Sequence, residues 1–178
     1  MINRKNIFVI IGSASQNSAN EKLVDCIADL TKEDFNLTVF NSLKSLPHFD
    51  PELSITNPPG IILELRHKIE NADGIIICTP EYVFSIPSGL KNLLEWCVST
   101  TVFSEKPIGL ITASADGKKG HEELKLLMRT VLTKFTDETT LLIHGIKGKI
   151  NEKGQITNEK TKRELLKFIE AFKTLIKE

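Results

Sequence analysis

The chain has 178 residues, enough for one domain with a buried core, and 40% hydrophobic and 26% charged residues are typical of a globular protein. Its 23 basic and 23 acidic residues balance, so the charge does not favour nucleic acid or another polyanion as a partner. No apolar run approaches the roughly 18 residues that span a bilayer, so we expect no membrane partner.

The cysteines predict the compartment. Cys26, Cys78 and Cys97 are far apart and lie within apolar patterns. Their spacing fits neither a metal site nor a disulfide, and it is typical of buried thiols in a reducing compartment. The opening segment "MINRKN" runs directly into a strand-like run and is not typical of a signal peptide. We therefore expect a cytoplasmic protein.

Short apolar runs alternate with longer amphipathic stretches along the chain. The runs are mostly continuous, as expected for strands covered on both faces of a parallel sheet, and we predict strands at 6–11, 37–40, 74–78, 107–112 and 139–144. Between and after them, apolar residues recur at helical spacing, and we predict helices with apolar stripes at Leu23–Leu30, Ile62–Ile69, Leu90–Cys97, Leu124–Val131 and Leu165–Ile176.

This alternation predicts an α/β fold with a doubly wound, five-stranded parallel sheet, formed as a single domain over residues 1–178. Residues 42–60 hold four prolines and are expected to form a long irregular connection, and 145–157 a polar excursion before the last helix. In such sheets ligands bind beyond the carboxyl ends of the strands, at the switch in strand order. The polar segments after the first, third and fourth strands are therefore expected to meet there.

The first of these segments, "GSASQNSAN" (12–20), has more hydrogen-bonding capacity than a turn requires. Ser18 and Glu21 form an S-x-x-E capping box at the start of a helix. Ser18 could serve only as this cap, but a helix N-terminus with several hydroxyl groups beside it also favours an anion. The segment has neither the Gly-Lys-Ser/Thr of a P-loop nor a G-x-G-x-x-G pattern. We interpret it as a site for a phosphate monoester.

The second segment carries the most specific motif. "TPEYVFSIPSGLKNLLEW" (79–96) strongly resembles the signature of the NADPH-dependent FMN reductase family, which includes flavin, azo-dye, quinone and chromate reductases. "LPHFDPEL" (46–53) and "SADGKKG" (114–120) resemble further segments of that family. The resemblance implies a flavodoxin-like fold, bound FMN and NAD(P)H as co-substrate.

The resemblance also implies the positions of the cofactor contacts. The FMN phosphate would be held by Ser13, Ser15, Ser18, Ala19 and Asn20, through side chains and backbone N–H groups. The flavin ring would be bordered by Pro80, Glu81, Tyr82 and Val83, chiefly through backbone groups, and by Ser114, Asp116 and Gly117. The chain departs from the family's usual residues at two positions, with Ser15 in place of an arginine and Val83 in place of an asparagine.

The function implied is transfer of hydride from NAD(P)H through FMN to a small acceptor such as a quinone, azo compound, flavin or metal oxyanion. The flavin carries this chemistry, so no side chain is assigned a catalytic role and no metal is expected. Lys118 and Lys119 are either solvated charges or contacts for a nucleotide phosphate. The alternatives are a flavodoxin-type electron carrier, which is usually strongly acidic whereas this chain is neutral, and a flavin-free binding module.

The helix expected at 88–99 predicts self-association. Its apolar residues surround the helix rather than forming one stripe. A helix that is apolar on all sides is buried on several sides. The family resemblance also implies a contact between subunits here, so we expect a homodimer or homotetramer.

Overall fold

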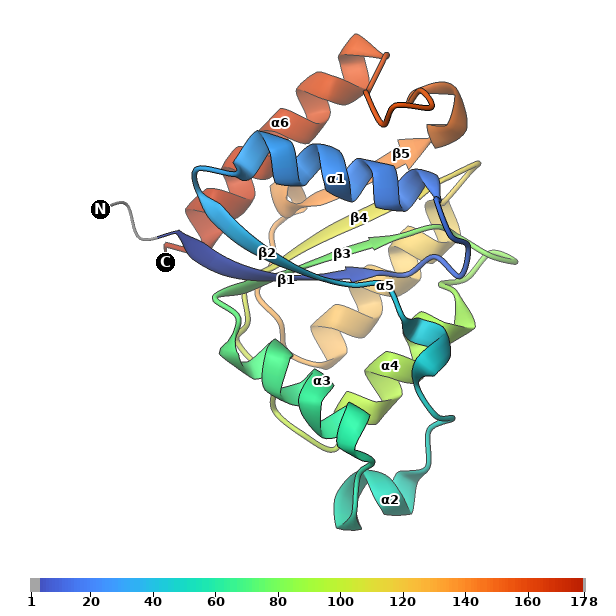
Figure 1. Ribbon diagram of the computed structural model, residues 1–178, viewed down its shortest axis with the longest axis vertical. Coiled ribbons are helices and arrows are strands. Elements are labelled where there is room, and N and C mark those ends of the chain that lie inside the picture. The colour runs from blue at the N-terminus through green and yellow to red at the C-terminus, as the bar shows by residue number, and fades with distance from the viewer. Residues whose placement is uncertain (1–3, 178) are drawn as a thin grey trace.

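A computed structural model describes residues 4–177, which contain one five-stranded parallel sheet in the order β2-β1-β3-β4-β5 (Figure 1). The strands are β1 (Lys5–Ile11), β2 (Phe35–Phe40), β3 (Gly74–Thr79), β4 (Ile108–Ser114) and β5 (Thr140–His144). This topology confirms the predicted fold class. The order of the strands reverses between β1 and β3, where the chain leaves one half of the sheet for the other.

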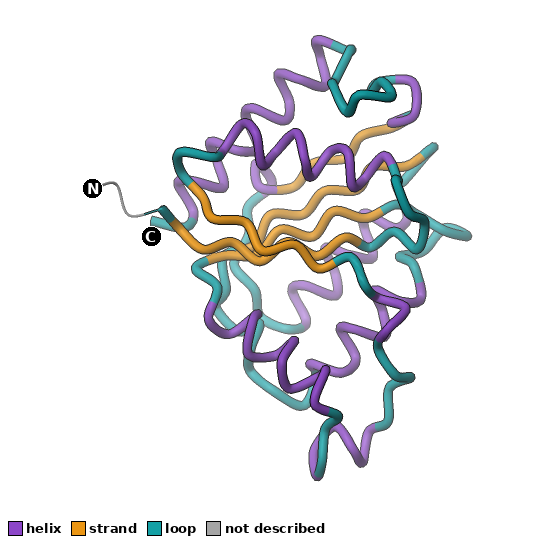
Figure 2. The backbone as a smooth tube through the Cα atoms, in the orientation of Figure 1, coloured by secondary structure: helices purple, strands orange, loops and turns teal. Residues whose placement is uncertain are grey.

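Helices cover both faces of the sheet (Figures 1 and 2). One face is covered by α1 (Ala19–Thr31) and α6 (Glu159–Leu175), and the opposite face by α3 (Gly60–Asn71), α4 (Ser88–Cys97) and α5 (Lys118–Thr130). A short helix, α2 (Pro51–Thr56), lies beyond α3 and α4 at the end of the molecule. None of the helices within residues 4–177 has the length and apolarity needed to cross a bilayer.

The sheet divides the core into two layers because side chains of a strand alternate between its faces. In β1, Ile7, Val9 and Ile11 pack toward α1 and α6, whereas Phe8 and Ile10 pack toward α3 and α4. All six residues of β3 are buried. Continuous apolar runs therefore form strands here because both faces of the central sheet are covered.

Two regions differ from the expectation. Residues 42–60 were expected to be irregular but include α2, whose start is stabilised by the Asp50 carboxylate, which accepts from the backbone N–H groups of Glu52 and Leu53 at 2.9 Å. Strand β2 begins two residues before the apolar run at 37–40, because Phe35 and Asn36 pair in register with Lys5 and Asn6 of β1. Backbone pairing extends the strand beyond its apolar residues.

The apolar surface of α4 is covered within the single chain. Leu90, Leu93, Leu94, Trp96 and Cys97 are all buried by the sheet and by the connection 42–60. The Trp96 indole N–H donates to the Pro47 carbonyl at 2.9 Å, and its ring packs edge-on against Phe49. Residues distant in sequence thus complete the burial of the helix, so its own apolar residues do not require a second copy, whereas Val98, just beyond its end, remains exposed.

Candidate functional site

The three polar segments expected at the carboxyl ends of the strands do lie together. The Gly12 N–H donates to the Cys78 carbonyl at 2.8 Å, which extends the pairing of β1 and β3 past the end of β1. The Ser114 hydroxyl donates to the Glu81 carbonyl at 3.4 Å and joins the loop after β4 to the loop after β3. We refer to 12–18, 80–87 and 114–117 as the first, second and third loops.

The start of the first loop is determined by close packing. A Cβ at Gly12 would overlap the side chain of Thr79, so only glycine fits where β1 ends. Beyond it, Ser13 is buried, and its Oγ accepts from the Ser15 N–H at 3.2 Å. The loop therefore turns tightly against β3 before α1 begins.

The predicted capping box at the start of α1 is present. Ser18 Oγ accepts from the Glu21 N–H at 3.1 Å, and Glu21 Oε2 accepts from the Ser18 N–H at 3.0 Å. Several other backbone N–H groups find no acceptor within residues 4–177, namely those of Ala14, Gln16, Asn17, Ala19 and Asn20. Unpaired N–H groups at a helix N-terminus with hydroxyl groups beside them fit a phosphate.

Asn20 supports the loop from behind rather than facing it. Its side-chain nitrogen donates to the Ala113 carbonyl of β4 at 3.2 Å, and its Oδ1 accepts from the Cys78 thiol of β3 at 3.3 Å. Burial raises the pKa of Cys78 and keeps the thiol a neutral donor. The Asn20 side chain therefore ties α1 to two strands, and its backbone N–H is the group that remains free for a ligand.

The second loop contains a strained tight turn. Tyr82 and Ser85 exchange backbone hydrogen bonds of 2.9 and 3.0 Å, and between them Val83 and Phe84 have φ values of 52° and 59°. Such a turn favours Asn or Gly, and a β-branched residue there is a conformational outlier. The Val83 side chain is 94% exposed. Valine in place of the family's asparagine therefore strains the backbone and leaves the side chain in solvent.

Two carboxylates hold the second loop against α5. Glu81 accepts from the N–H groups of Gly117 at 3.3 Å and Gly120 at 2.8 Å. In the opposite direction, Glu123 of α5 accepts from the Ser85 hydroxyl at 2.6 Å and the Ile86 N–H at 2.9 Å. Sequence reasoning assigned Glu81 backbone contacts and did not identify Glu123. One signal in the sequence could have indicated that a carboxylate from elsewhere, here Glu81, caps α5: the helix starts at a glycine and has no acidic residue in its first turn.

The third loop is more open. Asp116 is exposed and lies 3.4 Å from Nδ1 of His144 at the end of β5. Gly117 has a φ of 90°, and a Cβ there would lie 2.9 Å from Leu142, so the turn into α5 requires glycine. The loop thus presents Ser114, Asp116 and Gly117 on the same edge of the sheet as the first two loops.

Comparison with known proteins agrees with this arrangement. Residues 5–142 match the family model described as NADPH-dependent FMN reductase. The chain belongs to this family. It is 27% identical to a 2-hydroxy-1,4-benzoquinone reductase of Burkholderia sp., over 97% of this chain and 96% of that protein. It is 30% identical to the NADH-dependent flavin reductase subunit 2 of Lactobacillus johnsonii, over 71% and 68% of the two chains.

A solved structure shows the same fold over nearly the whole chain. FerB, a flavoenzyme NAD(P)H:(acceptor) oxidoreductase from Paracoccus denitrificans, aligns with a TM-score of 0.86 and 26% identity, covering 97% of each chain. These findings confirm the family, the flavodoxin-like fold and the cofactor pair, FMN and NAD(P)H, expected from the sequence. The chain is an NAD(P)H-dependent FMN reductase.

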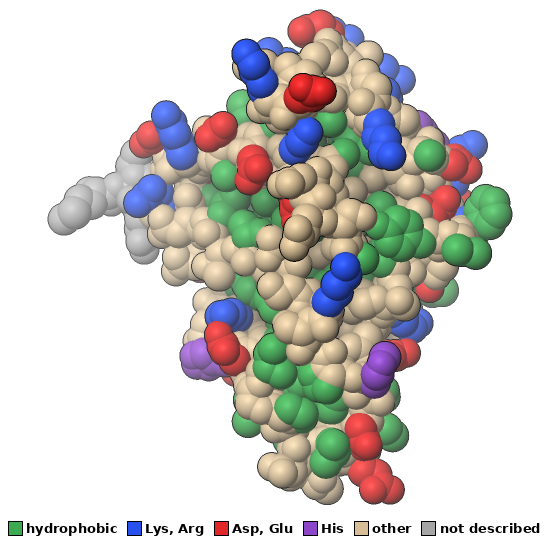
Figure 3. Space-filling view, turned by 45° about the vertical axis from the view of Figure 1, so that its right-hand side comes forward, with side chains coloured by type: hydrophobic (Ala, Val, Ile, Leu, Met, Phe, Trp, Pro, Cys, Tyr) green, Lys and Arg blue, Asp and Glu red, His purple; other side chains and the backbone are tan. Residues whose placement is uncertain are grey.

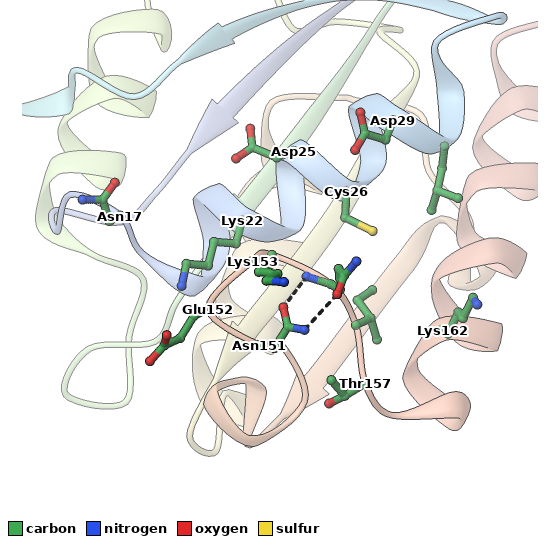
Figure 4. A pocket seen from close by; sticks show the side chains of 14 residues that line it. Asn17, Lys22, Asp25, Cys26, Asp29, Asn151, Glu152, Lys153, Thr157 and Lys162 are labelled. Carbon is green, nitrogen blue, oxygen red and sulfur yellow. Dashed lines mark hydrogen bonds between the residues drawn. The ribbon is translucent and has the colours of Figure 1, made fainter.

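A groove of about 690 Å³ begins beside the first loop of this FMN reductase, where Asn17 lines one end. Lys22 of α1 and Lys153 of the hairpin-like loop 149–157 also line it (Figure 4). The hairpin is closed by hydrogen bonds between Asn151 and Gln155. The excursion expected at 145–157 therefore places Lys153 in the same groove as Lys22 of α1 and Asn17 of the first loop, which sequence reasoning missed.

The surface of the reductase around this edge mixes charges and apolar groups. In Figure 3 basic and acidic side chains alternate, and hydrophobic side chains reach the surface between them. In the second loop the exposed hydrophobic residues are Tyr82, Val83 and Phe84. Within residues 4–177, no three His, Cys, Asp or Glu side chains form a cluster that could hold a metal ion.

His121 of the reductase is a core residue. It lies on the buried side of α5, with Nδ1 2.9 Å from the Thr112 hydroxyl of β4. Burial, with a smaller contribution from Lys125, lowers the pKa of His121 to about 4. The imidazole is therefore neutral near pH 7, and it packs against the sheet below the site.

Replacing Val83 by Asn should stabilise the protein. Asn tolerates a positive φ and Val does not, so relief of strain is expected to raise the free energy of unfolding by about 1 kcal/mol. The measurement is urea denaturation of the flavin-free protein. Val39→Asn is the control, since Val39 is also exposed but lies in the extended backbone of β2. Equal effects of the two substitutions would contradict the assignment of strain.

The depressed pKa of His121 predicts a loss of stability in acid. In the unfolded chain the pKa of this histidine is about 6.5, whereas in the folded chain it is about 4, so the unfolded chain binds the proton first as the pH falls. The free energy of unfolding should therefore fall between pH 6.5 and 4, by up to about 3 kcal/mol from this group. Urea denaturation across this range should show a smaller fall in His121→Gln than in wild type. His48→Gln, at an exposed position, should retain the full fall.

Proposed function

We propose that the first, second and third loops of this reductase hold the FMN through which it passes electrons from NAD(P)H to a small-molecule acceptor. The observation that carries the proposal is the start of α1, where unpaired backbone N–H groups and serine hydroxyls lie beside two ordered loops in a member of the FMN reductase family. The chemistry supplied by the bound flavin is acceptance of a hydride and its return as electrons to the acceptor.

The first loop and the start of α1 are proposed to bind the phosphate. Hydroxyls of Ser13, Ser15 and Ser18 would donate to it, together with the backbone N–H groups of Ala19 and Asn20. Ser18 can do this while its oxygen still accepts from Glu21, because a hydroxyl both donates and accepts. The lack of an arginine in this loop leaves binding to neutral donors and the helix N-terminus.

The other two loops are proposed to orient the flavin ring. Backbone groups of Pro80, Glu81, Tyr82 and Val83 would meet its polar edge, with Ser114, Asp116 and Gly117 on the other side. No side chain acts as a catalytic acid or base in this proposal. The nearest histidines support that choice, because His121 is buried against Thr112 and His144 is paired with Asp116.

The proposed acceptor is a quinone or a free flavin. The two relatives above are named for a benzoquinone and for flavin. Exposed Tyr82, Val83 and Phe84 beside the site favour a planar, apolar oxidant over a metal oxyanion. For the nucleotide, Lys118, Lys125 and Arg129 line a shallow groove along α5, which is suited to phosphates of NAD(P)H.

The rival function is that of a flavodoxin-type carrier. One experiment separates the two. The purified protein should be yellow, and anaerobic addition of NADPH or NADH should bleach it at catalytic speed. A yellow protein that neither nucleotide bleaches would support the carrier, and a colourless protein that takes up no FMN would contradict both. Steady-state rates with quinones, azo dyes, flavins and chromate would then identify the acceptor.

The protein is also proposed to act in the cytoplasm as a homodimer or homotetramer. Leu53 and Ile55 of α2 are exposed, as is Val98 at the end of α4. The segments that carry them are adjacent, because the hydroxyls of the neighbouring residues Ser54 and Ser99 are 2.8 Å apart. We call Leu53, Ile55 and Val98 the α2 patch. Exposed apolar residues gathered in this way favour contact with a second copy.

Ser18→Ala should weaken FMN binding about 10- to 100-fold and leave riboflavin binding nearly unchanged, because a hydrogen bond to a charged phosphate is lost. Ser15→Arg should tighten FMN binding by adding a charge pair. The measurement is flavin fluorescence titration of the flavin-free proteins with both ligands.

Asn158→Ala is the control for the cap, since Asn158 begins α6 by accepting from the Thr161 N–H at 2.9 Å. Both alanine variants should lose about 1 kcal/mol of stability. Only Ser18→Ala should lose FMN affinity. If Ser18→Ala weakens FMN and riboflavin equally, the first loop does not bind the phosphate.

Ile55→Lys should dissociate the proposed oligomer, because it introduces a charge into the α2 patch. Sedimentation velocity at micromolar concentration should show a dimer or tetramer for wild type and a monomer for the variant. Leu166→Lys, at an exposed position on α6, should leave the association state unchanged. A flavin-loaded wild-type monomer would contradict the proposal.

A further inference from the structure

Glu81 has a charged side chain fixed between two of the loops that the proposed function places beside the flavin ring. We propose that Glu81 is a positioning residue whose carboxylate also lowers the reduction potential of bound FMN. The inference rests on the proposed function, because it requires FMN to bind at these loops. It adds a role for a side chain to which the motif assigns only backbone contacts.

The first step is that Glu81 supplies the N-terminal cap of α5. The helix starts at Gly117, which has no side chain, and Lys118 and Lys119 place positive charge in its first turn. Basic residues at a helix N-terminus are unfavourable because they add to the positive end of the helix dipole. The Glu81 carboxylate accepts from the N–H groups of Gly117 and Gly120 and so offsets this charge.

The second step is that the carboxylate cannot swing away. A Cβ at Gly120 would lie 3.2 Å from Glu81 Cγ, so the side chain is packed directly against the helix backbone. The Glu81 carbonyl accepts from the Ser114 hydroxyl at 3.4 Å. The backbone and the side chain of one residue thus contact both ends of the third loop. The negative charge is therefore held in place by contacts within the chain.

The third step concerns the charge that the reaction adds. With FMN bound, hydride transfer from NAD(P)H, which brings two electrons and one proton and releases NAD(P)⁺, would leave one added negative charge at the site until a second proton is taken up. A fixed carboxylate nearby opposes that charge. By occupying N–H groups of α5, Glu81 also withholds donors that would stabilise it. Both effects would lower the reduction potential of bound FMN and so favour transfer of its electrons to the acceptor.

Glu123 offers a matched comparison. It bridges the same helix and loop, through the Ser85 hydroxyl and the Ile86 N–H. It lies about one turn after Gly120 along α5. It does not contact the N–H groups at the start of the helix. Glu123→Gln therefore tests the structural part of this interface without removing the charge at the end of the helix that borders the third loop.

The experiment compares wild type with Glu81→Gln and Glu123→Gln. The midpoint potential of bound FMN is measured by anaerobic dye-equilibrated titration, the affinity for oxidised FMN by fluorescence, and the stability of the flavin-free proteins by urea denaturation. Both variants should be less stable than wild type. Only Glu81→Gln should raise the potential of bound FMN. The rise should correspond to an increase of about five- to twentyfold in the ratio of the affinity for reduced FMN to the affinity for oxidised FMN.

An unchanged potential in Glu81→Gln, or the same rise in both variants, would overturn the inference while leaving the proposed function intact. Wild-type protein that binds no FMN would overturn both. If Glu81→Gln is too unstable to isolate with FMN, the substitution is made in the Val83→Asn background, which is expected to be more stable, with Val83→Asn alone as the reference. A potential raised above that reference supports the inference, and an unchanged one contradicts it.

Discussion

The parallel pairing of β1 with β3 is the constraint on which the site depends. The chain leaves β1 over one face of the sheet, through α1, and leaves β3 over the other, through α4. Two adjacent strands whose connections diverge leave open space beyond their carboxyl ends. The hydrogen bond from Gly12 to Cys78 carries the pairing one residue past β1, and contact with Thr79 excludes any side chain there. The position of the first loop follows from these contacts.

The loops around this space are held by groups that lie behind them. Asn20 anchors the start of α1 to β3 and β4, and Glu81 and Glu123 link the second loop to α5. Because these contacts form within the chain, they restrict the loops, which reduces the entropy lost on binding. They also allow the turn at Val83 and Phe84 to persist in a strained conformation, as expected near a functional site.

The features that the sequence predicted well are those that depend on neighbouring residues. Five continuous apolar runs identified the strands, and Ser18 and Glu21 identified the capping box, because both patterns are local. The features it missed depend on contacts between distant residues. Trp96 is covered by Pro47 and Phe49, and Glu81 reaches Gly120. The helix α2 was missed because its six residues are too few to show a period among prolines. The family motif located the second loop, but only the backbone angles showed that Val83 is strained.

The reliance of α5 on Glu81 links the motions of two parts of the protein. A helix without its own cap frays from that end when the cap is withdrawn. The first turn of α5 can therefore open only when the second loop moves away, and the second loop cannot move while Glu123 retains Ser85 and Ile86. The two segments are separated by some thirty residues in sequence, yet they form one cooperative unit, whose amide protons should exchange with solvent together.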